Sequence, residues 1–197
     1  MQEFPAKVRT IISKLQEAGY EAYAVGGCVR DSYMGRVPND WDITTNAVPE
    51  QVKAIFRRTI DVGIEHGTVK IMMGADGYEV TTYRIDGEYE DNRHPKEVTF
   101  TPDLREDLRR RDFTINAMAY SEKTGLVDLF GGMQDLRDGI VRAVGDPAER
   151  FNEDASEVDK LTLTHEAFGR EGLAAGAVAA ALMTEGLKGV HEFKELL

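Results

Sequence analysis

The spacing of apolar residues predicts an alternation of helices and short strands along the first three quarters of the chain. Apolar residues recur at helical spacing from Val8 to Ala18, and Gly19 ends this first helix. The same criteria predict three more helices, at 28–34, 49–56 and 104–119. Alternating and β-branched runs predict short strands at 21–25, 40–43, 68–73, 78–84 and 126–128.

Two connecting segments refine this prediction. The sequence Gly74-Ala75-Asp76-Gly77 separates two strands and ends in Asp-Gly, which is typical of a hairpin turn. Residues 85–102 are polar and include Gly87 and Pro95, which predicts a long mobile loop of the kind that is usually functional. Helices that alternate irregularly with strands around a hairpin indicate an α+β fold, whose mixed, mostly antiparallel sheet is flanked by helices.

The chain changes character after Glu149. Residues 151–197 are rich in alanine and glycine and have helical tendency, so we expect a domain at 1–150 and a short helical tail at 151–197. Within this tail an apolar stripe is formed by Leu173, Ala177, Ala180 and Ala181. The stripe is suited to packing on the domain or on a second copy of the chain, so a homo-oligomer is one alternative.

The composition is that of a soluble globular protein, with 42% hydrophobic and 30% charged residues. No apolar run approaches the roughly 20 residues of a membrane span, and no secretory signal opens the chain. The single cysteine, Cys28, excludes an internal disulfide and fits a reducing compartment, so we expect a cytoplasmic protein with no membrane partner. The net charge of −11 leaves only a local basic surface for RNA.

The first candidate for chemistry is the pair Gly26-Gly27, followed by Arg30, between a predicted strand and a predicted helix. Glycines let backbone N–H groups approach an anion, and a helix N-terminus favours negative charge. Arg30 lies one turn later and can reach a phosphate. The alternative is a simple strand-to-helix turn, which a bare Gly-Gly does not exclude.

Acidic residues form the next candidates. Asp40 and Asp42 begin a predicted strand, where alternation would direct both carboxylates to one face. Two such carboxylates can hold Mg²⁺, a hard cation that prefers oxygen ligands. Glu79, in the predicted strand 78–84, could complete a carboxylate trio. A solvated strand face is the alternative for all three acids.

The last candidate begins with three consecutive arginines, residues 109–111, and continues through Asp112 to Asn116. Consecutive arginines fan around a helix, so only one or two of them share a face. Such arginines could clamp a triphosphate by forked hydrogen bonds. An ordinary charged helix face is the alternative.

Taken together, these motifs resemble the class of tRNA nucleotidyltransferases that includes bacterial CCA-adding enzymes and bacterial poly(A) polymerases. The head of the CCA-adding enzymes is the most similar part. The matching segments cover nearly everything from about residue 20 to residue 155 and are Gly26-Gly27-x-Val29-Arg30-Asp31, Asp40-x-Asp42-Ile43, Gly63-x-x-His66-Gly67-Thr68-Val69, Glu79-Val80-Thr81-Thr82, Arg110-Arg111-Asp112-Phe113-Thr114-x-Asn116-Ala117 and Asp128-x-Phe130-Gly131-Gly132.

The resemblance implies a nucleotidyltransferase-type head and Mg²⁺-dependent, template-independent transfer from CTP and ATP to an RNA 3′ end, natively CCA addition to tRNA. It implies that Asp40 and Asp42 bind the metal and that Glu79 is the third catalytic acid. Nucleotide contacts are implied for Gly26, Gly27, Arg30, Arg111, Asp112, Asn116 and Asp154. In the implied two-metal mechanism, one Mg²⁺ would activate the attacking 3′-hydroxyl and the other would stabilise the triphosphate and the leaving pyrophosphate. Arg30 and Arg111 would offset the negative charge of the phosphates.

The resemblance also has a limit. The family carries Glu-Asp-x-x-Arg after the head, and its Asp and Arg pair with the incoming base. Here Asp154 is present, but Glu157 occupies the arginine position. From Ser156 onward no resemblance is found, and the helical regions that hold tRNA in the family have no counterpart, so we expect weak tRNA binding.

Two alternatives to CCA addition stay open. Poly(A)-type activity is the close alternative, because both groups share the head. A nucleotide-binding but catalytically weak module that acts through oligomerisation is the second. The intact acidic and arginine motifs favour an enzyme, whereas the missing arginine favours the module.

Overall fold

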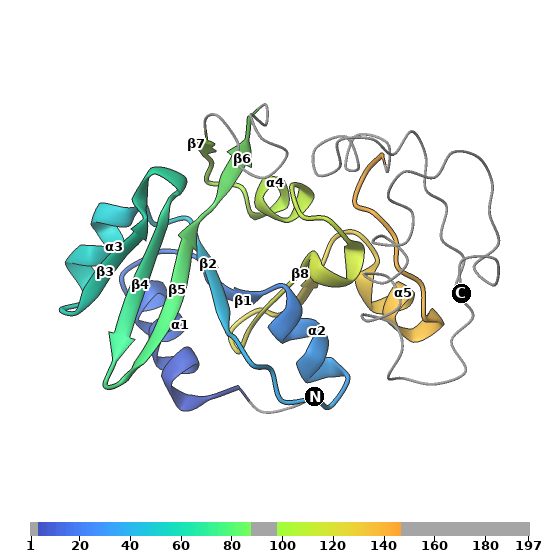
Figure 1. Cartoon of the computed structure of the whole chain (residues 1–197), viewed down its shortest axis with the longest axis horizontal. Helices are drawn as coiled ribbons and strands as arrows, with labels where there is room; N and C mark the ends of the chain where they lie inside the picture. The colour runs from blue at the N-terminus through green and yellow to red at the C-terminus, as the bar shows by residue number, and fades with distance from the viewer. Residues whose placement is uncertain (1–3, 88–97, 147–197) are drawn as a thin grey trace, which may run out of the picture.

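Seven strands form the central sheet of the structure, in the order β3-β4-β5-β2-β1-β8-β9 (Figure 1). The computed structural model describes residues 4–87 and 98–146. The strands of this sheet are β1 (Ala22–Val25), β2 (Asp42–Thr45), β3 (Thr59–Gly63), β4 (Thr68–Met73), β5 (Asp76–Thr82), β8 (Met118–Ser121) and β9 (Gly125–Asp128). Every neighbouring pair is antiparallel except β2 and β5, which are parallel. The predicted mixed, mostly antiparallel sheet is therefore confirmed.

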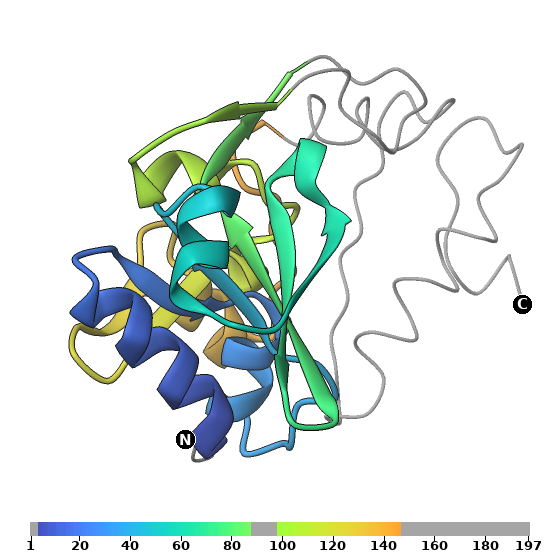
Figure 2. The ribbon, with the colours of Figure 1, turned by 90° about the vertical axis from the view of Figure 1, so that its left-hand side faces the viewer.

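Helices flank both faces of this sheet, as the α+β prediction requires. The helices are α1 (Ala6–Glu17), α2 (Gly27–Tyr33), α3 (Pro49–Ile55), α4 (Leu104–Arg109) and α5 (Gly132–Asp138), with short 3₁₀ turns η1 (Ile64–His66) and η2 (Thr114–Asn116). In the turned view, α1 and α3 lie next to each other on the same side of the strands (Figure 2). A second, two-stranded sheet consists of β6 (Arg84–Asp86) and β7 (Val98–Phe100).

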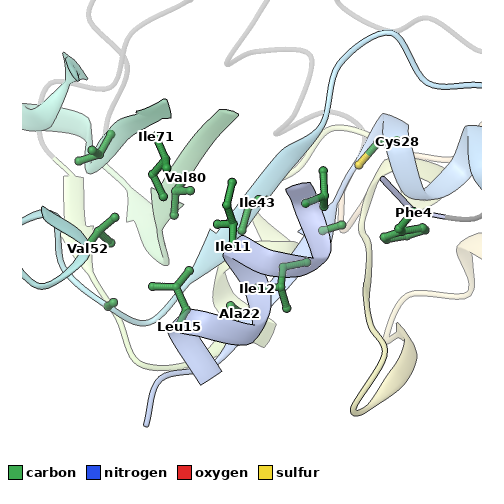
Figure 3. Packing of buried hydrophobic residues seen from close by; sticks show 14 of the residues in the cluster. Phe4, Ile11, Ile12, Leu15, Ala22, Cys28, Ile43, Val52, Ile71 and Val80 are labelled. Carbon is green, nitrogen blue, oxygen red and sulfur yellow. The ribbon is translucent and has the colours of Figure 1, made fainter. Parts of the chain in front are cut away.

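Alternation along β1 divides the core between the two faces of the sheet. Ala22 and Ala24 belong to the cluster that α1 and α3 cover, where Ile11, Leu15 and Val52 pack on Ile43, Ile71 and Val80 (Figure 3). Tyr23 and Val25 belong instead to the cluster that contains Leu104 and Leu108 of α4. Because side chains alternate along a strand, α4 covers the opposite face. This second face also carries the candidate site.

The predicted helix at 104–119 is wrong beyond its first third. Asp103 caps α4 by accepting a hydrogen bond from the backbone N–H of Arg105, and the helix ends at Arg109. Phe113 is then extended and forms a bridge with Ala143, because Thr114 N donates to Arg142 O and Val144 N donates to Asp112 O. The apolar run that follows pairs with β1 as β8, so tertiary pairing overrides helical propensity here.

Two strand assignments also need correction. β3 is absent from the sequence prediction, because its apolar residues Ile60 and Val62 are exposed at the sheet edge and give no core-facing pattern. The β4–β5 turn consists of Gly74 and Ala75 alone, since Met73 already pairs with Asp76. Gly74 has φ +75°, so glycine supplies the left-handed conformation in a turn that lies two residues earlier than the Asp-Gly signal suggested.

The predicted loop at 85–102 is wrong at its ends, which pair as β6 and β7. Its middle, residues 88–97, and the predicted tail at 151–197 lie outside the described residues. The domain boundary, the apolar stripe and a homo-oligomer through the tail therefore stay predictions. In the part of the chain that the structure describes, no helix has the length and apolar character needed to cross a membrane.

Candidate active site

The Gly-Gly turn joins β1 to α2 in a backbone conformation that only glycine adopts readily. Gly26 has φ 84° and ψ −141°, a region that L side chains avoid. Its N–H donates to Met118 O at 3.1 Å, which ties the turn to β8. The Gly26 amide is thus already used inside the fold. The prediction that the backbone N–H groups of this turn approach an anion is therefore wrong for Gly26.

Two arginine side chains lie over the two glycines. A Cβ on Gly26 would lie 3.2 Å from Nη1 of Arg111, and a Cβ on Gly27 would lie 3.4 Å from Nη2 of Arg30. Glycine therefore lets both guanidinium groups approach the turn closely. The predicted glycine and arginine motifs, 84 residues apart between Gly27 and Arg111 in the sequence, meet in space.

A chain of hydrogen bonds holds Arg30 in place. Its Nε donates to Oδ1 of Asp31 at 2.9 Å, and its Nη1 donates to Oδ1 of Asn116 at 2.6 Å. Nδ2 of Asn116 in turn donates to Oδ1 of Asp112 at 3.3 Å. This chain links α2 to the segment around η2 and groups three of the predicted nucleotide-binding residues. Their contact with a nucleotide stays a prediction.

The carboxylates lie on the α4 face of the sheet, at the start of β2 and the middle of β5. Ile43 pairs with Val80, and both pack in the α1 core, so Asp42 and Glu79, one position earlier, face the opposite side. Glu79 forms an ion pair with Lys70 at 3.0 Å across β4 and β5. The structure thus places Asp42 and Glu79 at paired positions on the same face of the sheet, while the trio with Asp40 stays a prediction.

Asp40 needs a correction, because β2 begins only at Asp42. Strand alternation therefore does not align the two carboxylates, contrary to the sequence argument. The connecting Trp41 is held instead by packing, with its ring centroid 4.6 Å from that of Phe4. Asp40 nevertheless acts electrostatically on Asp42, as the pKa of that residue shows.

The pKa of Asp42 reports how the charges of the site combine. Partial desolvation of the carboxyl raises this pKa, although the residue is exposed, and the nearby Arg111 lowers it. Glu79 and Asp40 raise it further by like-charge repulsion. The net shift is upward, and its main cause is desolvation, while the charges of Arg111, Glu79 and Asp40 act in opposite directions on the same carboxyl.

The neighbouring carboxylates are the feature that suits a cation. Carboxylate oxygens that repel each other are suitable ligands for Mg²⁺, which also accepts phosphate and water oxygens. In residues 4–87 and 98–146, no three His, Cys, Asp or Glu side chains lie close enough to hold a metal ion by themselves. A metal at Asp40 and Asp42 would therefore need oxygens from a bound phosphate or from water to complete its shell.

One residue of the site is missing from the sequence prediction. Asp107 is fully buried and accepts hydrogen bonds from Oγ1 of Thr44 and Nε of Arg110, both at 3.0 Å. Its Oδ2 also lies 3.6 Å from Nη2 of Arg111. The signal was available, because a helix places residue 107 on the same face as the apolar Leu104 and beside Leu108. An acid in that position needs buried partners.

The three consecutive arginines lie at the end of α4 and beyond it, so they do not form a charged face of a helix. Arg109 ends α4 and Arg110 is its C-cap, so Arg111 lies just beyond the helix. Burial lowers the pKa of Arg111, whereas Asp107 raises it, and the side chain is only 18% exposed. Arg111 thus leaves solvent and points into the site. Asp154 and Glu157 lie outside the described residues.

Comparisons with known proteins show which family this chain resembles. The chain matches the family described as Poly A polymerase head domain over residues 22–142. It is 56% identical over 147 residues to a CCA-adding enzyme of Limosilactobacillus fermentum, covering 75% of this chain and 37% of the relative. It is 55% identical over 148 residues to a CCA-adding enzyme of Streptococcus suis, with the same shares of both chains.

A solved structure is similar over the same region. The crystal structure of the Bacillus stearothermophilus CCA-adding enzyme in complex with CTP matches with a TM-score of 0.67 at 49% identity, covering 74% of this chain and 35% of that chain. The chain therefore spans little more than a third of the length of the relatives it matches.

Proposed function

The chain belongs to the Poly A polymerase head domain family, and we propose that it binds a nucleoside triphosphate and transfers its nucleotide to an RNA 3′ end. CTP and ATP are the proposed donors, and a tRNA that lacks its terminal CCA is the proposed acceptor. Curated relatives named CCA-adding enzymes, at more than half identity over three quarters of this chain, support this choice over other transferases. CTP in the similar solved structure supports the first donor.

One observation carries the proposal. Arg111 lies over Gly26 and Arg30 lies over Gly27, on the sheet face where Asp42 and Glu79 also lie. Two guanidinium groups beside a side-chain-free turn leave room for a triphosphate, and each can form forked hydrogen bonds to phosphate oxygens. The acids next to them would face the reacting α-phosphate. Arg111 also lies close enough to Asp42 to lower the pKa of its carboxyl, so a cation and a carboxylate are neighbours in this site.

We assign the roles as follows. Arg30 and Arg111 offset charge on the triphosphate as it develops during transfer. Asp40 and Asp42 hold Mg²⁺, with Glu79 as the third acid, and the position of Asp42 opposite Glu79 on neighbouring strands supports this donor set. When bound, Mg²⁺ favours ionisation of the attacking hydroxyl and neutralises charge on the phosphates. Asn116 accepts a hydrogen bond from Arg30 and donates one to Asp112, and we assign both residues to contacts with the nucleotide.

Transfer to a tRNA transcript that ends before CCA tests the proposal. The unmutated chain should incorporate labelled CTP and then ATP only when Mg²⁺ is present. Runs of adenosine would indicate poly(A)-type activity instead, and triphosphate binding without transfer would indicate a catalytically weak module. Failure to bind any triphosphate would contradict the proposal as a whole.

The domain division at 1–150 and 151–197 belongs to the same proposal. The described secondary structure ends with α5 and the pairing of Val144 with Asp112, shortly before residue 150. This supports a head that closes on itself through residues 142–144. Light scattering on the full chain tests whether residues 151–197 bring two copies together.

A further inference from the structure

A fully buried carboxylate lies beside the proposed phosphate site. Asp107 of α4 has 0% exposed surface, and its two oxygens have different partners. Oδ1 accepts from Nε of Arg110, whereas Oδ2 accepts from Oγ1 of Thr44 in β2. Water does not compete for these contacts, so each is strong and its loss is costly.

Arg111 is the residue through which Asp107 reaches the site. Nη2 of Arg111 lies 3.6 Å from Oδ2 of Asp107, and Nη1 lies 3.2 Å from the Cβ position on Gly26. Nε of Arg111 is buried and has no hydrogen-bond partner among the described residues. Because a guanidinium is planar and rigid, a fixed Nη2 also fixes the direction of Nη1. The contact with Asp107 therefore sets where Arg111 points.

Thr44 supports this arrangement from the sheet. Its hydroxyl donates to Oδ2, the same oxygen that faces Arg111, and so fixes the orientation of the carboxylate. Thr44 lies two residues after Asp42 and faces the same side of β2. The strand that carries the metal-binding acid therefore also orients the phosphate-binding arginine, through Asp107.

We infer that Asp107 is a positioning residue, which holds the Arg111 guanidinium against Gly26 in the orientation that binds the triphosphate. Asp107 does not touch the nucleotide itself. The inference rests on the proposed function of the Gly26-Gly27 turn. The competing explanation is a buried ion pair that only packs α4 onto β2. Both explanations predict lower stability without Asp107, so the test must measure phosphate binding.

The test is a double-mutant cycle on the full chain, read by calorimetric titration with tripolyphosphate, CTP and ATP in the presence of Mg²⁺. Asp107→Asn keeps the shape and an acceptor for Thr44 but removes the charge. It should weaken the binding of all three ligands by the same factor, about tenfold. The factor should be equal because the affected arginine contacts the phosphates, which tripolyphosphate shares with CTP and ATP although it has no base. In the Arg111→Ala background, Asp107→Asn should change the affinity by less than about twofold.

Asp135→Asn is the matched control. Asp135 is also buried, accepts from Oγ1 of Thr114 at 2.7 Å and pairs with Arg142 at 3.0 Å, so the variant loses comparable contacts. It should lower the Tm but leave tripolyphosphate affinity within about twofold. Equal weakening of phosphate binding by both asparagine variants would overturn the inference.

Thr44→Val decides the matter if Asp107→Asn does not fold. It removes the hydroxyl donor to Oδ2 but leaves both charges in place. Tripolyphosphate binding should weaken by about two- to fivefold, and this effect should vanish in the Arg111→Ala background. If the loss of tripolyphosphate affinity caused by Thr44→Val simply added to the loss caused by Arg111→Ala, this inference would be overturned while the proposed function would stand. Absence of triphosphate binding by the unmutated chain would overturn it together with the proposed function.

Discussion

Nη1 of Arg30 lies 2.6 Å from Oδ1 of Asn116, and this hydrogen bond joins two residues 86 positions apart in the chain. The Gly26 amide makes a parallel connection to Met118 O. Both bonds tie the β1–α2 turn to the segment that enters β8. The turn and the arginine motif are therefore one structural unit, so a substitution in one should alter the side-chain positions in the other.

Asn116→Ala should weaken CTP binding by about three- to tenfold. Arg30 would keep its contact with Asp31 but lose the partner that holds it over Gly27. Calorimetric titration of the variant and of Arg30→Ala measures both losses. The double variant should bind no worse than Arg30→Ala. A lower Tm with unchanged CTP affinity would show that Asn116 only stabilises the fold.

Gly26→Ala should reduce both stability and triphosphate affinity, whereas Gly35→Ala should reduce stability alone. Both glycines have positive φ, so alanine is strained at either position, by about 1–3 kcal/mol. Only at Gly26 does the new methyl group meet Arg111, at 3.2 Å from Nη1, while Gly35 has open space. Thermal melts and CTP titrations of the two variants give the comparison. Equal CTP affinity in both would contradict the placement of the triphosphate.

The fold was predictable where one periodicity governs a whole element. Val8, Ile11, Ile12 and Leu15 bury one face of α1 as their spacing indicates. The prediction failed where long-range pairing decides, as at Phe113, which is held extended by its bridge to Ala143. No local signal reveals such a partner thirty residues away.

The sequence supplied the motifs of the proposed site but not its geometry. The spacing of Asp40 and Asp42 suggested a shared strand face, yet β2 begins at Asp42. Asp107 lies among apolar helix positions, and its role depends on Thr44, Arg110 and Arg111 arriving from two elements. Sequence shows which groups are chemically capable, whereas their mutual orientation needs the fold.

Asp42→Asn should abolish nucleotidyl transfer, and Asp40→Ala should do the same, while circular dichroism shows an intact fold. The expected loss is on the order of several kcal/mol of transition-state stabilisation, because the metal would lose a charged ligand. Asp61→Asn is the control, since Asp61 lies on the edge strand β3 and pairs with Lys53. Mn²⁺ titration followed by electron paramagnetic resonance measures metal binding directly. Near-normal turnover of Asp42→Asn would remove this assignment.

Cys28 should make the protein less stable at high pH. Burial raises the pKa of its thiol from 9.0 to about 11. Below pH 9 the thiol is protonated in both the folded and the unfolded chain, so it contributes nothing to the pH dependence. Between pH 9 and 11 the unfolded chain releases the proton while the folded chain keeps it, which favours unfolding.

The size of this effect can be isolated with Cys28→Ala. The stability of the unmutated chain relative to Cys28→Ala should fall by about 2 kcal/mol between pH 8 and pH 10.5. Urea unfolding followed by the fluorescence of Trp41, the one tryptophan, measures both proteins under the same conditions. Parallel stability curves would mean that the thiol ionises as easily in the folded chain as in the unfolded one.

The last prediction concerns base selectivity. Choosing C or A over G or U requires groups that present hydrogen bonds to the base edge, and arginine supplies donors in a fixed fork. On the resemblance described above, Glu157 occupies the position of that arginine, and an ionised glutamate offers only acceptors. The described site groups that we assign to the nucleotide, Arg30 and Arg111 above all, would grip the triphosphate and not the base. The four ribonucleoside triphosphates should therefore bind with affinities within roughly tenfold, about 1.4 kcal/mol. Titration of all four with Mg²⁺ measures this, and Glu157→Arg should restore a preference for CTP and ATP. A preference well beyond tenfold in the unmutated chain would mean that another residue reads the base.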